Sequence, residues 1–227
     1  MIGILGAMYE EVSVIVSEMT NVTEDKIANL KFFKGKYDNK DLVIVQSGIG
    51  MVNASIATTL LYERYNVDKI IFSGVGGAVL ENIKTLDLVI GDSFVEYQFD
   101  VTSAGNYVKG QIAGTSKRDI DPTYELLEIA KTVESKVPKH YGRIASADVF
   151  VDSYDEKTRI RDEFDAAVVD MESAAVAQTC TVLNVPYLII RSISDSLGDN
   201  SGIEYEKFVE LASVNSKDFL MKLIKKL

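Results

Sequence analysis

Short apolar runs alternate with amphipathic segments along the chain, and small residues mark most boundaries between them. Runs rich in Val and Ile favour strands, whereas apolar residues repeated every three or four positions favour helices. Strands are predicted at residues 2–5, 30–37, 42–46, 69–73, 87–97, 141–147, 166–169 and 186–193. Helices are predicted from residue 8, at 50–64, from Asp121-Pro122, at 154–164, at 172–183 and along the stripe Phe208, Leu211, Ala212, Phe219, Leu223, Ile224 and Leu227.

Strands that alternate with helices predict an α/β fold in which helices cover both faces of a largely parallel sheet. The runs at 30–37 and 42–46 flank Asn39-Lys40 and predict a hairpin, so the sheet should be mixed. We expect one domain over residues 1–227, a three-layer α/β/α sandwich, because the chain shows no low-complexity linker and no internal repeat. Ligands of such folds bind at the carboxyl ends of the strands.

Composition narrows the class of protein. Hydrophobic residues make up 47% of the chain and charged residues 26%, which are ordinary globular proportions. The net charge of -10 would repel nucleic acid and anionic membranes, so we expect neither as a partner. The opening residues lack the basic stretch of a signal peptide, and no apolar run is long enough to span a membrane. We therefore expect a cytoplasmic protein.

The rarest reactive side chains exclude several kinds of site. Cys180 is the only cysteine, so no intrachain disulfide can form, and its place among small helical residues predicts a core position. His140 is the only histidine, which excludes clustered-histidine metal sites. A Ser-His-Asp triad would have to use His140, which we expect to be a structural surface residue.

Two glycine-rich segments invite a nucleotide-binding interpretation. The run Gly48-Ile49-Gly50-Met51-Val52-Asn53 nearly matches a dinucleotide fingerprint, but Asn53 replaces its third glycine, and a tight strand-to-helix turn is favoured. The second segment, Gly74-Val75-Gly76-Gly77, lacks the Lys-Ser/Thr pair of a phosphate-binding loop. Its glycines follow a predicted strand and would either let the backbone approach a ligand closely or form a bare turn. No cofactor and no metal are expected.

Carboxylates follow three of the apolar runs directly, as Glu10 and Glu11, as Asp170 and Glu172, and as Asp195. Desolvating a carboxylate costs several kcal/mol in order of magnitude. Acids directly after apolar strands are therefore explained best if these strand ends face a cleft. Stabilisation of a helix N-terminus, worth about 0.5–2 kcal/mol, is the structural alternative. Acids without metal-type clustering suit acid/base work, and N-glycosidic hydrolysis fits because the leaving base needs a proton and the water needs a base. Spacing alone does not select a nucleoside over a sugar.

Several short motifs occur along the chain in the same order as in a known enzyme family. They are Ile2-Gly-Ile-Leu-Gly-Ala-Met8 with Glu10-Glu11, Ser47-Gly-Ile-Gly50 with Val52-Asn-Ala54, Asp100-Val-Thr102, Ser146-Ala-Asp-Val-Phe-Val151, Val169-Asp-Met-Glu-Ser-Ala-Ala175 and Arg191-Ser-Ile-Ser-Asp195. In this order they resemble the 5'-methylthioadenosine/S-adenosylhomocysteine nucleosidases of the nucleoside phosphorylase/nucleosidase superfamily. The resemblance implies a nucleoside phosphorylase-like fold, an adenine nucleoside substrate and a homodimer.

The resemblance also implies roles for individual residues. Glu11 would activate the attacking water, and Asp195 would protonate adenine at N7, with Ser194 orienting it. The other implied contacts are Glu172 and Met171 at the ribose, Phe150 and the Val151 backbone at adenine, Met8, Ile49 and Tyr205 at the alkylthio group, and Val75, Gly76 and Gly77 beside sugar and base. Structural interpretations stand beside these: Met171 and Phe150 as core, Tyr205 as packing, Arg191 as the partner of a buried acid, and Asp148 and Asp170 as supports.

The chain departs from the family pattern at several positions. Tyr9 stands where relatives usually carry another glutamate, Val75-Gly76 where a Ser-Ala or Val-Ala pair is frequent, and Tyr97-Gln98 where a His-Asp pair is common. Ala104 occupies the place of a phenylalanine that closes the neighbouring subunit's pocket in the family. These departures bear on the substrate tail more than on the reaction.

Three alternatives remain open at the level of sequence. A phosphorylase of the same superfamily would need arginines around phosphate, whereas Glu11 would repel that anion, and Arg64 and Arg143 lie outside the matched motifs. A non-catalytic nucleoside-binding protein would not require both an acid and a base. Aminodeoxyfutalosine could be the main substrate of a nucleosidase, and the sequence does not rank methylthioadenosine, S-adenosylhomocysteine and 5'-deoxyadenosine.

Overall fold

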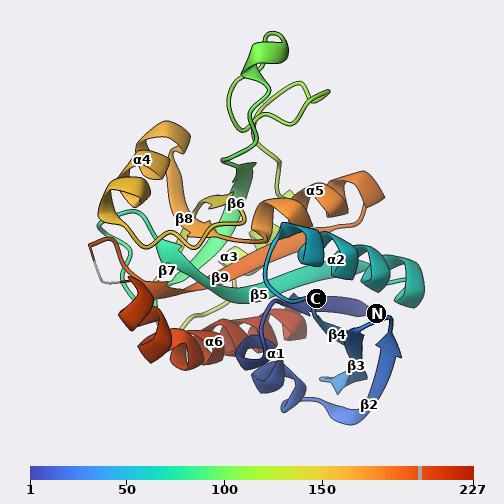
Figure 1. Cartoon of the computed structure of the whole chain (residues 1–227). Helices are drawn as coiled ribbons and strands as arrows, with labels where there is room; N and C mark the ends of the chain where they lie inside the picture. Colours follow the sequence, from blue (N-terminus) through green and yellow to red (C-terminus); the bar gives the residue numbers. More distant parts are fainter. Residues whose placement is uncertain (199–200) are drawn as a thin grey trace.

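The computed structural model describes residues 1–198 and 201–227 (Figure 1). The strands are β1 (Ile2–Gly6), β2 (Thr20–Ile27), β3 (Leu30–Tyr37), β4 (Lys40–Gln46), β5 (Lys69–Ala78), β6 (Leu88–Glu96), β7 (Lys139–Ser146), β8 (Ala166–Asp170) and β9 (Tyr187–Asp195). The helices are α1 (Tyr9–Val16), α2 (Met51–Tyr65), a 3-10 turn η1 (Thr102–Ala104), α3 (Tyr124–Lys131), α4 (Tyr154–Phe164), α5 (Ser173–Leu183) and α6 (Ser201–Lys226). Within the described ranges no helix is long and apolar enough to cross a membrane.

The strands form one mixed sheet in the order β2-β3-β4-β1-β5-β8-β7-β6-β9. Strand β1 runs parallel to both β4 and β5, and the β3–β4 hairpin adds the antiparallel edge that the sequence predicts. Strand β5 also pairs with β9, so the strands from β5 to β9 close on themselves while β1 to β4 extend from the ring as an open wing. The strand ends of ring and wing therefore meet near β5.

Helices cover both faces of the sheet, as predicted. Adjacent residues in β1 point to opposite sides, so Leu5 joins the core under α2 and α5 while Ile4 joins the core under α1, α3 and α6. Figure 1 shows α2 and α5 side by side above the wing, with α1 and α6 together on the other side. A third, smaller apolar cluster lies between α4 and the ends of β6, β7 and β8.

Three local predictions are wrong in instructive ways. Strand β2 is missing from the prediction because it is a polar, largely exposed edge strand without an apolar alternation. Helix α3 begins at Tyr124 with Thr123 as its N-cap, not at Asp121-Pro122, because Tyr187 fixes that segment: its N–H donates to Thr123 Oγ1 at 2.9 Å and its hydroxyl donates to the Asp121 carbonyl. Strand β5 does not end at residue 73 but continues through the glycines to Ala78.

Candidate active site

A cavity of about 360 Å³ opens where β1, β5, β8 and β9 end. Every residue that the sequence assigned to the site lines it: Met8, Glu11, Ile49, Val75, Gly76, Gly77, Phe150, Val151, Met171, Glu172, Ser194, Asp195 and Tyr205. Ala7, Val149, Val169 and Asp170 complete the lining. Segments from residue 7 to residue 205 therefore converge on one hollow, at the strand ends where the fold predicts a ligand.

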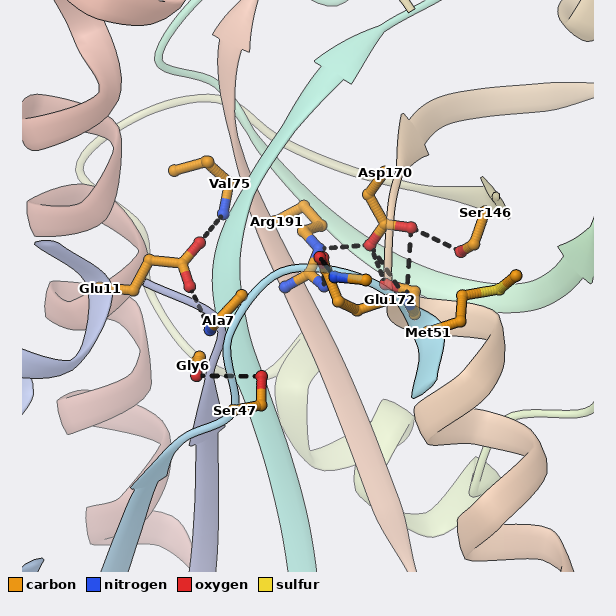
Figure 2. A network of polar contacts seen from close by, with 12 residues as sticks. Gly6, Ala7, Glu11, Ser47, Met51, Val75, Ser146, Asp170, Glu172 and Arg191 are labelled. Carbon is orange, nitrogen blue, oxygen red and sulfur yellow. Dashed lines mark hydrogen bonds and ion pairs between the residues drawn. The ribbon is translucent and has the colours of Figure 1, made fainter. Parts of the chain in front are cut away.

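Glu11 is fixed by backbone donors from two elements. Its Oε2 accepts the N–H groups of Ala7 at 2.6 Å and Met8 at 3.1 Å, and its Oε1 accepts the N–H of Val75 at 3.0 Å. Figure 2 shows the carboxylate between Ala7 and Val75 of β5, with a hydrogen bond to each. Burial raises the pKa of Glu11, while the charge of Arg191 and the three N–H donors act in the opposite direction. Glu11 thus stabilises the start of α1 and also presents a buried carboxylate to the cavity.

A buried ion pair joins Arg191 to Asp170, which lines the cavity (Figure 2). Arg191 Nε donates to Asp170 Oδ2 at 2.8 Å, and the guanidinium stacks over the Phe72 ring at 3.7 Å from its centroid. Asp170 also accepts hydrogen bonds from Ser146 and Ser173. The interpretation of Arg191 as the partner of a buried acid is confirmed: Arg191 and Asp170 form an ion pair that ties β9 to β8 and to the start of α5.

Glu172 reaches across the cavity to the glycine turn before α2. It occupies the N-cap position of α5, and its Oε1 accepts the N–H of Gly50 at 2.9 Å. Gly50 has φ 102°, and a side chain there would place its Cβ 2.9 Å from Asp148 Oδ1. The tight turn favoured over a dinucleotide site is confirmed, and only glycine fits it. Burial, followed by the charge of Asp170, raises the pKa of Glu172 well above its ordinary value.

Asp195 ends β9 with both carboxylate oxygens engaged. Ser194 Oγ donates to its Oδ1 at 2.7 Å, the contact that an orienting role requires. Its Oδ2 forms an ion pair with Lys157 of α4, which is 1% exposed. Sequence reasoning missed Lys157 because α4 looked uniformly polar, although Lys157, Ile160 and Phe164 share the helical spacing of a buried face.

Aromatic and sulfur-containing side chains form the mouth of the cavity. Phe150 and Tyr205 meet edge to face with ring centroids 5.6 Å apart, and the Tyr205 hydroxyl donates to Met8 Sδ at 2.8 Å. Burial, helped by the charge of Glu11, raises the pKa of Tyr205 to about 12, so its hydroxyl keeps its proton at neutral pH. Phe150 is 48% exposed and Ile49 52% exposed, so the cavity is open on this side.

The segment Val75-Gly76-Gly77 is strand, not the bare turn that the sequence offered as one alternative. Gly77 pairs with Val169 of β8 and Asp195 of β9, because β5 is the strand at which the ring closes. A Cβ on Gly77 would lie 3.0 Å from Asp195 Oδ2. Because the glycines have no side chains where β5 pairs with β8 and β9, the strand leaves room for the carboxylates around the cavity.

Arg64, Arg143 and His140 do not line the cavity. Arg143 donates to the Phe164 carbonyl and pairs with Asp119, Arg64 is exposed on α2, and neither lines the cavity. His140 Nε2 lies 3.0 Å from Asp87 Oδ2, half-buried rather than at the surface. Across the described residues no group of three His, Cys, Asp or Glu side chains has the arrangement of a metal site.

Four carboxyl groups, those of Glu11, Asp170, Glu172 and Asp195, line one open cavity with an apolar rim. Comparison with known proteins identifies the class of enzyme that carries such a site. The family sequence model of the phosphorylase superfamily matches residues 1–225, so the chain belongs to that superfamily. Within it, the chain is 38% identical over 230 residues to the 5'-methylthioadenosine/S-adenosylhomocysteine nucleosidase of Staphylococcus haemolyticus (strain JCSC1435), with 99% of each chain covered. The chain belongs to this nucleosidase family.

Solved structures agree with this assignment. The 5'-methylthioadenosine/S-adenosylhomocysteine nucleosidase of Colwellia psychrerythraea 34H, in complex with adenine, superposes with a TM-score of 0.95 at 32% identity, covering 100% of this chain and 95% of that one. The futalosine hydrolase of Helicobacter pylori strain 26695 superposes equally well, with a TM-score of 0.95 at 33% identity and coverage of 100% and 97%. The predicted nucleoside phosphorylase-like fold is confirmed.

Proposed function

We propose that the protein hydrolyses the N-glycosidic bond of 5'-methylthioadenosine and S-adenosylhomocysteine, with 5'-deoxyadenosine as a further candidate substrate, and releases adenine and the 5'-substituted ribose. The observation that carries this proposal is the convergence of Glu11, Glu172 and Asp195 from three elements on one cavity. A base, a sugar-binding carboxylate and an acid are the groups that this reaction needs. The family membership supports the same reaction.

The proposed mechanism divides the work among the three carboxyl groups. Asp195 passes its proton to N7 of adenine as the electron pair of the C1'–N9 bond moves onto the base. Water forms the new bond to C1' and loses a proton to Glu11. Glu172 hydrogen-bonds the ribose hydroxyls and holds the sugar in place. Met171 packs against the ribose and Phe150 against adenine.

Hydrolysis is favoured over phosphorolysis by the charge of the cavity. The described residues that line it include Glu11, Asp170, Glu172 and Asp195 but no Lys or Arg. A phosphate ion would meet carboxylates where a phosphorylase needs cations. Water, which is neutral, encounters no such repulsion.

A second candidate substrate shares the reaction. The futalosine hydrolase noted above has the same fold at 33% identity, so a nucleoside with a bulkier polar 5' group is a reasonable alternative. The Tyr205 hydroxyl supports it, because this polar group stands on the side of the cavity assigned to the 5' substituent. The test below therefore includes aminodeoxyfutalosine.

We also propose that residues 1–227 form one nucleosidase domain that works as a homodimer in the cytoplasm. Exposed apolar side chains continue outward from the cavity mouth onto α2, at Ile49, Val52 and Ile56. The segment between β6 and α3, which contains η1 and the exposed Val108, projects away from the body of the molecule (Figure 1). A second copy would cover the apolar surface and receive the projecting segment.

The experiment that tests the reaction is incubation with each nucleoside in phosphate-free buffer and then with added phosphate. We expect adenine and free methylthioribose without phosphate. A ribose 1-phosphate that forms only with phosphate would identify a phosphorylase instead. No adenine from any of the four nucleosides, despite tight binding, would identify a binding protein.

The assigned roles predict two inactive but folded variants. Glu11→Gln removes the base and Asp195→Asn removes the acid, so each should lower kcat by about 100- to 10,000-fold while substrate still binds. Steady-state kinetics and calorimetric binding of methylthioadenosine measure the two effects. Glu10→Gln is the matched control, because Glu10 precedes Glu11 but does not line the cavity. Near-normal turnover in either active-site variant would refute its assigned role.

A further inference from the structure

A buried ammonium group lies directly behind the proposed acid. Lys157 of α4 is 1% exposed, and its Nζ contacts two groups at the end of β9, the Oδ2 of Asp195 and the carbonyl oxygen of Ser196 at 3.3 Å. Lys157 does not line the cavity, whereas Asp195 does. The lysine therefore reaches the cavity only through the carboxyl group.

Packing alone does not explain a lysine at this position. Lys157 shares the buried face of α4 with Ile160 and Phe164, where an apolar side chain of similar length would fill the space. Replacing a buried ion pair by apolar residues is often neutral or stabilising, because two charges must leave water to form the pair. A buried pair at the edge of a cavity thus points to a use for the charge.

The distribution of charge around the site indicates that the Lys157 ammonium balances the charge of Asp195. Lys157 and Arg191 are the two buried basic side chains among the described residues. Arg191 is paired with Asp170, so Lys157 is the cation that balances Asp195. Among the described residues, the other ionisable acids that line the cavity are Glu11 from α1, Asp170 at the end of β8 and Glu172 from the cap of α5, and no Lys or Arg joins them. Without Lys157, an ionised Asp195 would stand in this environment with no cation beside it.

We propose that Lys157 is a positioning residue for Asp195, which it orients toward the purine and whose carboxylate it stabilises as the proton leaves. This inference rests on the proposed function. In the step concerned, the Asp195 carboxyl gives its proton to adenine N7 while the C1'–N9 electron pair passes to the base, so Asp195 gains one negative charge. Lys157 stays protonated throughout and supplies one compensating positive charge and one hydrogen bond. Ser194 holds the other carboxylate oxygen, which fixes the plane of the group.

Lys157→Met tests the inference because it removes the ammonium and keeps most of the side-chain length. We expect kcat for methylthioadenosine to fall about 10- to 100-fold with KM changed less than about threefold, since an electrostatic contribution to the transition state is lost while the cavity lining is unchanged. Lys157→Arg, which keeps the charge, should recover part of kcat. Arg159→Met is the matched control, because it removes a cation from the solvent-exposed side of α4, where Arg159 pairs with Glu156, and should leave kcat unchanged.

A double-mutant comparison separates positioning from structure. In the Asp195→Asn background, Lys157→Met should lower the residual kcat no further, because its effect passes through Asp195. Equal losses in both backgrounds, or wild-type kcat in Lys157→Met, would overturn the inference while the proposed function stands. If Lys157→Met does not fold, Lys157→Gln supplies the neutral variant, judged by the same two criteria. A wild-type protein that releases no adenine would overturn the proposed function and, with it, this inference.

Discussion

Glu11 and Glu172 are both buried beside the cavity, yet they are held differently. Glu11 accepts three backbone N–H bonds, which favour its charged form and suit a group that must take a proton from water. Glu172 accepts one N–H bond and lies near Asp170, which disfavours a second negative charge. Burial raises the pKa of both carboxyl groups, so each ionises at the expense of folding stability.

Glu172 predicts a pH-dependent stability with a definite sign. Its pKa is raised on folding, so its contribution is fully present below the unfolded value of 4.5 and is lost as pH rises through the folded pKa. Glutamine does not titrate. Glu172→Gln should therefore gain stability relative to the wild type between pH 5 and 8, by at most about 1.4 kcal/mol per pH unit.

Denaturant unfolding of both proteins at several pH values measures this difference. Glu134→Gln serves as the control, since Glu134 is exposed and its replacement should produce no trend with pH. A Glu172→Gln difference that stays constant from pH 5 to 8 would contradict the assigned environment.

Single residues also show how far the sequence could predict the site. Most of the cavity-lining candidates could be named because they sit in ordered motifs beside predicted strand ends, whereas Val75, Gly76, Gly77 and Tyr205 came from the family resemblance alone. Lys157 could not, because the burial of one lysine on a polar helix depends on which strand end the helix packs against. The same dependence places Arg191 beside Asp170, a pairing that the sequence offered only as an alternative.

At the scale of elements, β5 organises the site. It pairs with β1, β8 and β9, and its glycines let carboxyl and guanidinium groups approach the strand closely. The sequence predicts the strand but ends it too early, because consecutive glycines are typical of turns. What keeps them extended is pairing with two strands far away in the sequence. The apolar strands could be predicted because the pattern of Val and Ile that marks them lies within each strand.

The packing of β5 predicts that Gly74 tolerates no side chain. A Cβ there would collide with the Glu11 carboxylate and lie 2.9 Å from Arg191 Nη1. Gly74→Ala should lower kcat on the order of 10- to 100-fold by displacing Glu11, and should lower the free energy of unfolding by about 1–3 kcal/mol.

Gly3→Ala provides the matched control for this variant. It also adds a methyl group to a buried strand, 3.2 Å from the Val67 side chain, but Gly3 does not line the cavity. Kinetics and unfolding of both variants should show lost stability in each and lost activity only in Gly74→Ala. Equal kcat in the two variants would mean that Gly74 serves packing alone.

At the scale of the whole molecule, the proposed homodimer would account for both the open mouth of the cavity and the projecting segment between β6 and α3. Phe150 and Ile49, assigned to adenine and to the 5' group, are about half exposed, as a site completed by a second copy requires. The net charge of -10 opposes association at long range, so contact must depend on apolar burial. Ala104 in η1 offers little apolar area, which leaves Val108 as the larger exposed apolar group of that segment.

The proposed homodimer predicts that Ile56→Arg separates the two copies and also inactivates the enzyme. Ile56 is 50% exposed on α2 and outside the cavity lining, so an arginine there costs little in the monomer but places an unpaired charge in an apolar contact. We expect a monomer by analytical ultracentrifugation and at least a tenfold loss of kcat/KM, with wild-type specific activity also falling on dilution. Leu211→Arg, an equally exposed position on α6 across the sheet, should change neither. A monomeric Ile56→Arg variant with full activity would show that each chain forms a complete site alone, and the projecting segment would then need another role.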